Sequence, residues 1–158
     1  MAAGLQVKRL DSVQRGYLRE IDMTDTEAFV VHNFAPPSLR RCIGLLGLLH
    51  KRVLGKCHPG LNHILPFAQG LDANYHSKAL HPFEEKQDFQ ARLYRHSLFA
   101  YILVYIRLSQ GLVDLPSVKN FQSKLTVLAK FRSQTGEEGW RRSFQDCDEV
   151  AMMIYPIN

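Results

Sequence analysis

Basic side chains stand at both ends of a predicted helix that begins at Ser38 and runs to about Leu54, and phosphates are groups that such side chains bind. They are Arg40 and Arg41 near its start, and Lys51, Arg52 and Lys56 near its end. Because a helix rises about 1.5 Å per residue, the two groups lie roughly 16 Å apart along the axis. This separation is compatible with contacts to phosphates across a groove or along a duplex. The alternative is that these side chains cap helix ends and pair with the acidic C-terminal residues.

Charge is unevenly distributed along the chain. The formal net charge is +5, and residues 37–57 carry five basic and no acidic side chains. Residues 89–135 are again basic, with Asp114 as the one acid, whereas residues 137–149 hold five acids against two arginines. A basic middle with an acidic end suits a polyanionic partner, and a solvated basic surface explains it equally well.

Another pair of arginines lies on a predicted helix over Val7–Ile21. Its apolar residues recur at helical spacing and are Leu10, Val13, Tyr17, Leu18 and Ile21. Arg15 and Arg19 fall on a different side of this helix from the apolar residues. We therefore add both arginines to the candidate phosphate-binding set.

Turn and capping signals separate this helix from the helix that follows Ser38. Thr24 and Glu27 resemble a capping box that opens a short helix through Val31. The run Asn33–Pro37 ends that helix, because a proline disfavours helical geometry in the preceding residue. Ser38 is then predicted to cap the helix that reaches Leu54.

Two glycines interrupt the polar stripe of the Ser38–Leu54 helix. Gly44 and Gly47 lie between Arg40 and Lys51 at i, i+4, i+7 and i+11. Each glycine costs a helix about 1 kcal/mol relative to alanine, so both need a reason. Close approach of another backbone is the usual reason, and it could belong to a neighbouring helix or to a nucleic acid.

The sequence pattern also predicts helices in the second half of the chain, after the irregular stretch over residues 68–97. Leu98–Leu108 is apolar and β-branched, and its length favours a buried helix over a strand. Asp114–Ser117 is a turn that leads into a capped helix with Val118 and Phe121 on its apolar face. The expected fold is mainly α, an irregular bundle of short helices with a long central loop that leaves room for a minor β element.

Catalytic, metal and nucleotide sites have weak support in the sequence. Cys57, His58 and His63 lack the second close pair that structural zinc requires. No nucleophile elbow, no phosphate-binding Gly-Lys-Ser/Thr loop and no Asp-Asp pair for two-metal nucleotidyl transfer occurs. We expect no catalytic residue, no metal ligand and no cofactor in this chain.

Composition also indicates the cellular environment in which the chain is expected. The odd number of cysteines, three, does not make a disulfide framework, which favours a reducing, intracellular environment, nuclear or cytoplasmic. The longest apolar run, Leu98–Ile106, is far below the roughly 20 residues of a membrane span, so no membrane partner is expected.

Three stretches carry a family resemblance. Residues 10–19 read LDSVQRGYLR, residues 33–55 read NFAPPSLRRCIGLLGLLHKRVLG, and residues 95–122 contain RHSLF, VYIRL, VD and SVKNFQ. In letters, order and spacing they resemble the region downstream of the polymerase palm in LINE-type (non-LTR) retrotransposon reverse transcriptases. The resemblance covers about residues 9–144. Cys42 stands where those elements usually have an acid, and Ile106 where they usually have Asn.

The resemblance implies that this chain helps to hold a template–primer duplex, and it suggests how the chain is divided into segments. It suggests a helical thumb-like segment over residues 5–67, an irregular connecting loop over 68–97, a C-terminal helical segment over 98–144 and an acidic, apolar tail over 145–158. The palm with its paired aspartates is absent from this sequence, so polymerase activity would belong to a parent RNA-directed DNA polymerase.

Two hypotheses of function follow. In the first, the chain is a non-catalytic fragment that contacts the RNA or DNA backbone of template–primer. The residues assigned to this contact are Arg15, Arg19, Arg40, Arg41, Lys51, Arg52 and Lys56. In the alternative, the apolar Leu39–Leu54 helix needs a protein partner, and the chain is an interaction domain that docks on the rest of a polymerase polypeptide or on another protein.

Overall fold

The chain is built from short helices in a computed structural model that describes residues 2–60, 98, 100–137 and 139–145. The helices are α1 (Ala2–Glu20), α2 (Asp25–Val30), α3 (Pro37–Val53), α6 (Ala100–Ile106), α7 (Gln110–Val113), α8 (Val118–Gln134) and the 3-10 helix η2 (Trp140–Arg142). No strand occurs over these residues, which confirms the expected mainly α fold. The predicted loop over 68–97 and the tail after residue 145 lie outside the described residues.

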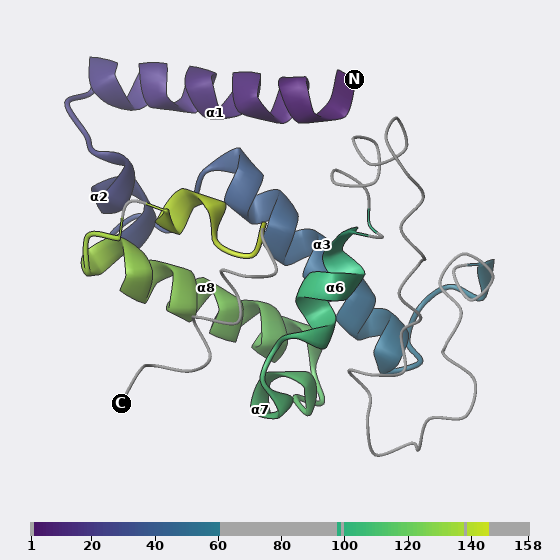
Figure 1. Ribbon diagram of the computed structural model, residues 1–158. Coiled ribbons are helices and arrows are strands. Elements are labelled where there is room, and N and C mark those ends of the chain that lie inside the picture. Colours follow the sequence, from purple (N-terminus) through teal and green to yellow (C-terminus); the bar gives the residue numbers. More distant parts are fainter. Residues whose placement is uncertain (1, 61–97, 99, 138, 146–158) are drawn as a thin grey trace.

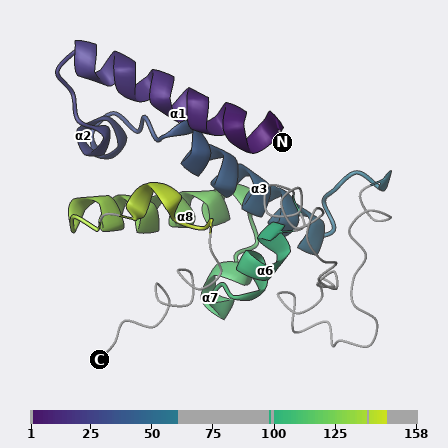
Figure 2. The same cartoon turned by 45° about the horizontal axis from the view of Figure 1, so that its top comes forward.

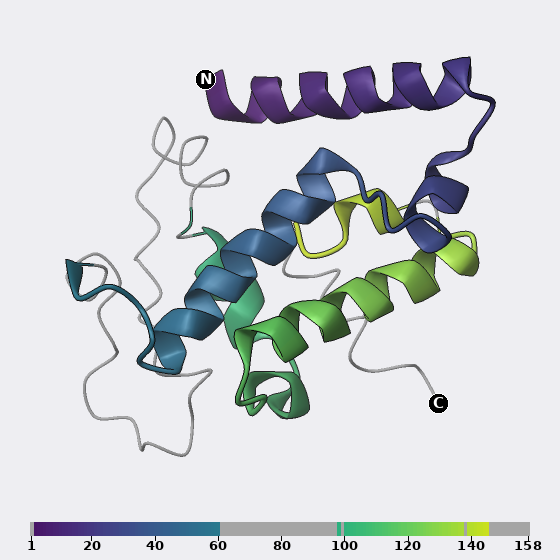
Figure 3. The same cartoon turned by 180° about the vertical axis from the view of Figure 1, so that it is seen from behind.

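Two long helices, α3 and α8, lie side by side at the centre of the fold (Figure 1). Helix α6 packs on α3, and α7 packs on α8. Helix α1 runs along one edge of the molecule beside the N-terminal end of α3, and α2 connects it to α8 (Figures 2 and 3). The helix predicted over Leu98–Leu108 is present as α6, so the preference for helix over strand at this stretch is confirmed.

The core is a single cluster in which α3 supplies the largest share. Its fully buried α3 members include Leu39, Leu46 and Leu49, which meet Tyr105 of α6 and Phe121 of α8. Burying side chains of this size stabilises a fold by roughly 1.5–3 kcal/mol each. Residues from both expected helical segments, 5–67 and 98–144, therefore share one core.

The start of α3 differs from the sequence prediction. Ser38 was expected to cap this helix, but the N-cap is Pro36 and Pro37 is the first helical residue. A proline tolerates the first helical position because its missing N–H would have no intrahelical acceptor there. The backbone N–H of Ser38 instead donates to Oδ1 of Asp11 in α1 at 2.9 Å. The cap of α3 thus comes from another helix.

The other predicted caps are present. The hydroxyl of Thr24 accepts the backbone N–H of Glu27 at 3.1 Å and opens α2. The hydroxyl of Ser117 accepts the backbone N–H of Asn120 at 3.5 Å and opens α8. In both cases the side chain satisfies an N–H that has no acceptor within its helix.

Most of the apolar residues that the sequence placed on the first helix are exposed to solvent. Helix α1 begins earlier than predicted, at Ala2, and only Leu18 of the expected apolar set is buried. The remaining four are Leu10, Val13, Tyr17 and Ile21, exposed by 55%, 70%, 56% and 46%. Inward contacts come instead from polar residues of α1, since Gln14 is buried and Asp11 caps α3.

The two glycines of α3 have different surroundings. A Cβ at Gly47 would lie 2.2 Å from Nε2 of Gln122 in α8, so Gly47 is where α8 approaches α3 closely. Gly47 therefore packs against a neighbouring helix, one of the two explanations that the sequence offered. At Gly44, which is exposed, a Cβ would meet no described atom within 4 Å.

Candidate nucleic-acid interface

Most of the candidate phosphate-binding residues lie on the surface. Five are exposed, namely Arg15, Arg19, Arg40, Lys51 and Lys56. Arg41 is half-buried, and Arg52 is only 7% exposed. Two ion pairs join described residues elsewhere, Arg132 with Glu137 and Arg141 with Asp25.

Arg52 lies on the inner side of α3. It follows the fully buried Leu49 by three residues, so the two residues share a face of the helix, and Arg52 is itself buried. A guanidinium at this position cannot reach a phosphate in solvent. The candidate interface therefore leaves Arg52 out, although the sequence grouped it with Lys51 and Lys56.

Two of the predicted arginines meet a third at a surface hollow of about 430 Å³. Arg15 and Arg19 line it from α1, and Arg141 lines it from η2. The rest of the wall comes from Leu18 of α1, from Asp22, Met23 and Thr24 after it, and from Asp25 at the start of α2. Arginine forks match the oxygens of a phosphate, so three of them around one hollow form an anion-binding geometry.

Arg141 is held in place by contacts with α2 and with its own neighbour. Its Nε donates to Oδ2 of Asp25 at 2.7 Å, and its guanidinium lies 5.0 Å from the centre of the Trp140 ring. The Trp140 ring stacks on Phe29 of α2, with centres 5.4 Å apart and planes 6° from parallel. Both rings are buried, so the position of Arg141 is fixed by the core.

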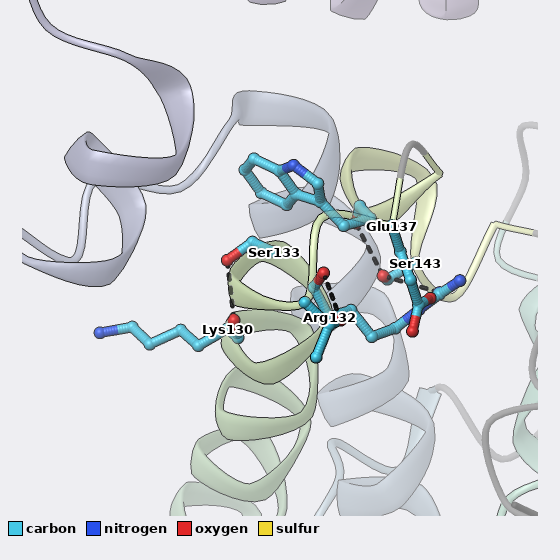
Figure 4. Close-up of polar contacts among 7 residues, drawn as sticks. Lys130, Arg132, Ser133, Glu137 and Ser143 are labelled. Atoms are coloured by element: carbon cyan, nitrogen blue, oxygen red, sulfur yellow. Dashed lines mark hydrogen bonds and ion pairs between the residues drawn. The ribbon is translucent and has the colours of Figure 1, made fainter.

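A second set of polar contacts, drawn in Figure 4, connects the C-terminal end of α8 to η2. Arg132 donates to the hydroxyl of Ser143 at 3.0 Å, and that hydroxyl donates to the Trp140 carbonyl at 2.7 Å. Arg132 also forms an ion pair with Glu137. These contacts join the last turn of α8 to η2 and thereby place Arg141 against the hollow.

The hollow has a positive excess of one formal charge, because its lining includes three arginines and two aspartates, Asp22 and Asp25. The Asp25 side chain is 8% exposed and is engaged by Arg141, whose side chain stays 44% exposed. Arg15 donates from Nε to the carbonyl of Asp11 at 3.4 Å. The two arginines of α1 are exposed, so their guanidinium groups can meet an incoming anion.

The basic residues of α3 lie outside this hollow. Arg40 donates to Oε1 of Gln14 at 3.5 Å and lies 5.5 Å from the centre of the Phe34 ring. At the other end, Lys56 donates to the carbonyl of Pro116 at 3.1 Å. The two ends of α3 are thus separate basic positions, and the structure does not gather the predicted residues into one cluster.

Arg141 is a site residue that the sequence patterns did not reveal. It counted only as one of two arginines in an acidic stretch, and its distance in sequence from α1 hides the contact. The one local feature at this position is the Trp140-Arg141-Arg142 run, and it does not identify which residues Arg141 contacts.

His50 has a structural place, although it lies in the stretch with the strongest family resemblance. It is fully buried and stacks on Phe121, with ring centres 4.2 Å apart. Its Nε2 lies 2.8 Å from the Leu115 carbonyl, and its Nδ1 lies 2.8 Å from the Tyr105 hydroxyl. A carbonyl only accepts, so Nε2 carries a proton, and in the neutral ring Nδ1 accepts from Tyr105.

Among the described residues, no three His, Cys, Asp or Glu side chains are grouped so that they could hold a metal ion. Within the same residues, no helix is both long and apolar enough to cross a membrane. Comparisons of the chain with protein-family models, curated proteins and solved structures give no match.

Proposed function

We propose that this chain is a non-catalytic nucleic-acid-binding segment of a LINE-type reverse transcriptase, and that it contacts the backbone of template–primer. The parent protein would be an RNA-directed DNA polymerase, whose catalytic aspartates lie outside this chain. The proposal rests on the resemblance of residues 9–144 and on the surface described above.

The observation that carries the proposal is the convergence of Arg15, Arg19 and Arg141 on one hollow. A nucleic-acid backbone presents phosphates at regular spacing, and rigidly placed guanidinium groups bind them without regard to sequence. Arg141 is fixed by its ion pair and its stacked neighbour, so less side-chain entropy is lost when an anion binds.

Exposed basic residues near the two ends of α3 add separate positive positions. Arg40 lies at the end near α1, Lys51 lies near the other end, and Lys56 follows three residues after the last residue of α3, Val53. We propose that a duplex with one phosphate in the hollow reaches these positions with further phosphates. Each added contact steepens the salt dependence of binding.

The alternative is a domain that docks through the apolar helix over Leu39–Leu54 on the rest of a polymerase polypeptide or on another protein. Most apolar residues of α3, including Leu39, Leu46 and Leu49, are buried in the core that α3 shares with α6 and α8. This burial is a reason to prefer the nucleic-acid proposal, and protein docking stays the alternative.

Fluorescence anisotropy with a labelled RNA–DNA duplex tests the proposal. The full chain should bind, and log affinity should fall linearly in log salt between about 50 and 200 mM. Substituting Arg15→Gln and Arg19→Gln together should weaken binding and reduce the magnitude of the salt slope by about 0.9 for each phosphate that is no longer neutralised. A second duplex of unrelated sequence should give the same result.

Matched controls come from α8, where Lys119 and Lys124 are exposed and lie outside the hollow. The pair Lys119→Gln and Lys124→Gln removes the same charge, and it should leave most of the affinity and slope intact. Equal losses of affinity in both pairs would mean that net charge alone drives binding. The absence of binding by the unaltered, folded chain at low salt would reject the proposal.

A further inference from the structure

Helix α1 and the residue that follows it carry an exposed apolar stripe. Leu10, Val13 and Tyr17 of α1, with Ile21 directly after its last residue, follow one another at i, i+3, i+7 and i+11 and are each about half exposed or more. Figures 1 and 3 show α1 along the edge of the molecule, with the remaining helices to one side of it. Apolar residues at this regular helical spacing are typical of the contact surface between two packed helices.

Charges of opposite sign flank this stripe at its two ends. Arg9 and Glu20 are exposed and lie 11 residues apart, about three helical turns, so they share one side of α1. Val13 and Gly16 lie between them on the same side, at four and seven residues from Arg9. A Cβ at Gly16 would meet no described atom within 4 Å, so the flank is open at its middle.

The stripe and its charges are arranged symmetrically about residue 15. Val13 and Tyr17 lie two residues to either side of it, and Leu10 and Ile21 lie five and six. Arg9 and Glu20 lie six and five residues away, with opposite charges. An antiparallel copy of α1 centred on the same residue would therefore set Leu10 beside Ile21 and Arg9 beside Glu20.

We propose that the exposed face of α1 is the interface of a homodimer, in which two α1 helices pair antiparallel. Each interface residue then meets a complementary residue of the second copy, as a two-fold axis requires. The apolar stripe supplies the attraction, and the two Arg9–Glu20 pairs select the antiparallel direction.

The dimer is compatible with the nucleic-acid proposal and does not depend on it. Arg15 and Arg19 lie on the side of α1 opposite the stripe, since they follow Leu10 by five and nine residues. Both hollows of a dimer would remain open, and an anion could bind each copy. Failure of nucleic-acid binding therefore leaves the dimer untouched, and the reverse also holds.

Sedimentation equilibrium of the full chain across a range of micromolar concentrations measures the association. The unaltered chain should dimerise, and Val13→Asp should make it monomeric while its helix content stays unchanged and its melting temperature no longer depends on concentration. Val127→Asp is the matched control, because Val127 is 60% exposed on α8, away from the stripe. A chain that stays monomeric, or one dissociated only by Val127→Asp, would overturn the proposal.

Charge exchange tests the antiparallel direction. Arg9→Glu alone would oppose two glutamates, and Glu20→Arg alone would oppose two arginines, so each should raise the dimer dissociation constant. The double variant restores opposite charges at both ends and should recover the original value. Two single effects that simply add in the double variant would contradict the pairing.

Discussion

Asp11 of α1 accepts the backbone N–H of Ser38 at 2.9 Å, so a carboxylate from one helix caps the N-terminus of another helix 27 residues later. The prolines at the start of α3 provide no side-chain cap of their own. The negative charge also lies at the positive end of the helix dipole, which adds to the stabilisation. The entry of α3 and the position of α1 are therefore coupled through one side chain.

Loss of this cap should destabilise the chain measurably. Asp11→Ala should lower the free energy of unfolding by about 0.5–2 kcal/mol, the range found for helix caps, and Asp11→Asn should cost less because it keeps an acceptor. Urea unfolding followed by circular dichroism measures both. Ser12→Ala, an exposed neighbour on α1, is the control. An Asp11→Ala midpoint equal to that of Ser12→Ala would contradict the capping role.

The two glycines of α3 predict opposite outcomes for the same substitution. Gly44→Ala should stabilise the chain by about 0.5–1 kcal/mol, because a Cβ there meets no described atom and alanine favours the helix. Gly47→Ala should fall short of this gain, since its Cβ would displace Gln122 and break the 3.5 Å bond from Gln122 to the Ile43 carbonyl.

A double-mutant cycle separates the clash from helix propensity. In a Gln122→Ala background, the clashing side chain is absent, and Gly47→Ala should then stabilise by an amount close to that of Gly44→Ala. Thermal or urea unfolding of the four chains gives the coupling energy. If Gly47→Ala stabilises equally with and without Gln122, the close approach of α8 at this residue does not restrict it.

The sequence predicts which segments are helical better than it predicts which way they face. Capping residues such as Thr24 and Ser117 act locally, so their patterns are readable and the structure bears them out. Helix α3 is apolar around most of its circumference, and such a pattern does not say that Arg52 points inward while Lys51 points outward.

Long-range pairings explain the remaining differences. A period of 3.6 residues reveals an apolar stripe on α1, but it cannot tell whether this chain or another molecule covers it. The hollow unites residues from α1 and η2, which are brought together by the packing of Trp140 on Phe29 and by the ion pair of Arg141 with Asp25. No local pattern in α1 or in η2 indicates that the two segments lie close together. Sequence patterns therefore identified Arg15 and Arg19 as candidates but not Arg141.

The hydrogen bond between His50 and Tyr105 should be worth more than that between Cys42 and Tyr101. Tyr105→Phe leaves the fully buried Nδ1 of His50 without its 2.8 Å donor, which should cost about 1–3 kcal/mol of unfolding free energy. Tyr101→Phe removes a 3.0 Å contact with a thiol, a weaker partner, and should cost less. Urea unfolding of the two variants compares them, and an equal or reversed order would refute the ranking.

Alkaline pH should destabilise the chain through three buried acids. Burial raises the pKa of the Cys42 thiol above its ordinary 9.0, and burial likewise raises the pKa of Tyr101 and of Tyr105 above 10.0. The unfolded chain therefore releases these protons first, so stability is full below about pH 9 and declines as the pH rises above it. Urea midpoints at a series of pH values measure this decline.

Removing a buried hydroxyl should flatten that pH dependence, because fewer protons then separate the folded from the unfolded chain. We expect Tyr105→Phe to lower the midpoint at neutral pH and to reduce its further loss under alkaline conditions. An alkaline slope equal to that of the unaltered chain would show that Tyr105 ionises with equal ease in the folded and unfolded chains, against the burial that surrounds it.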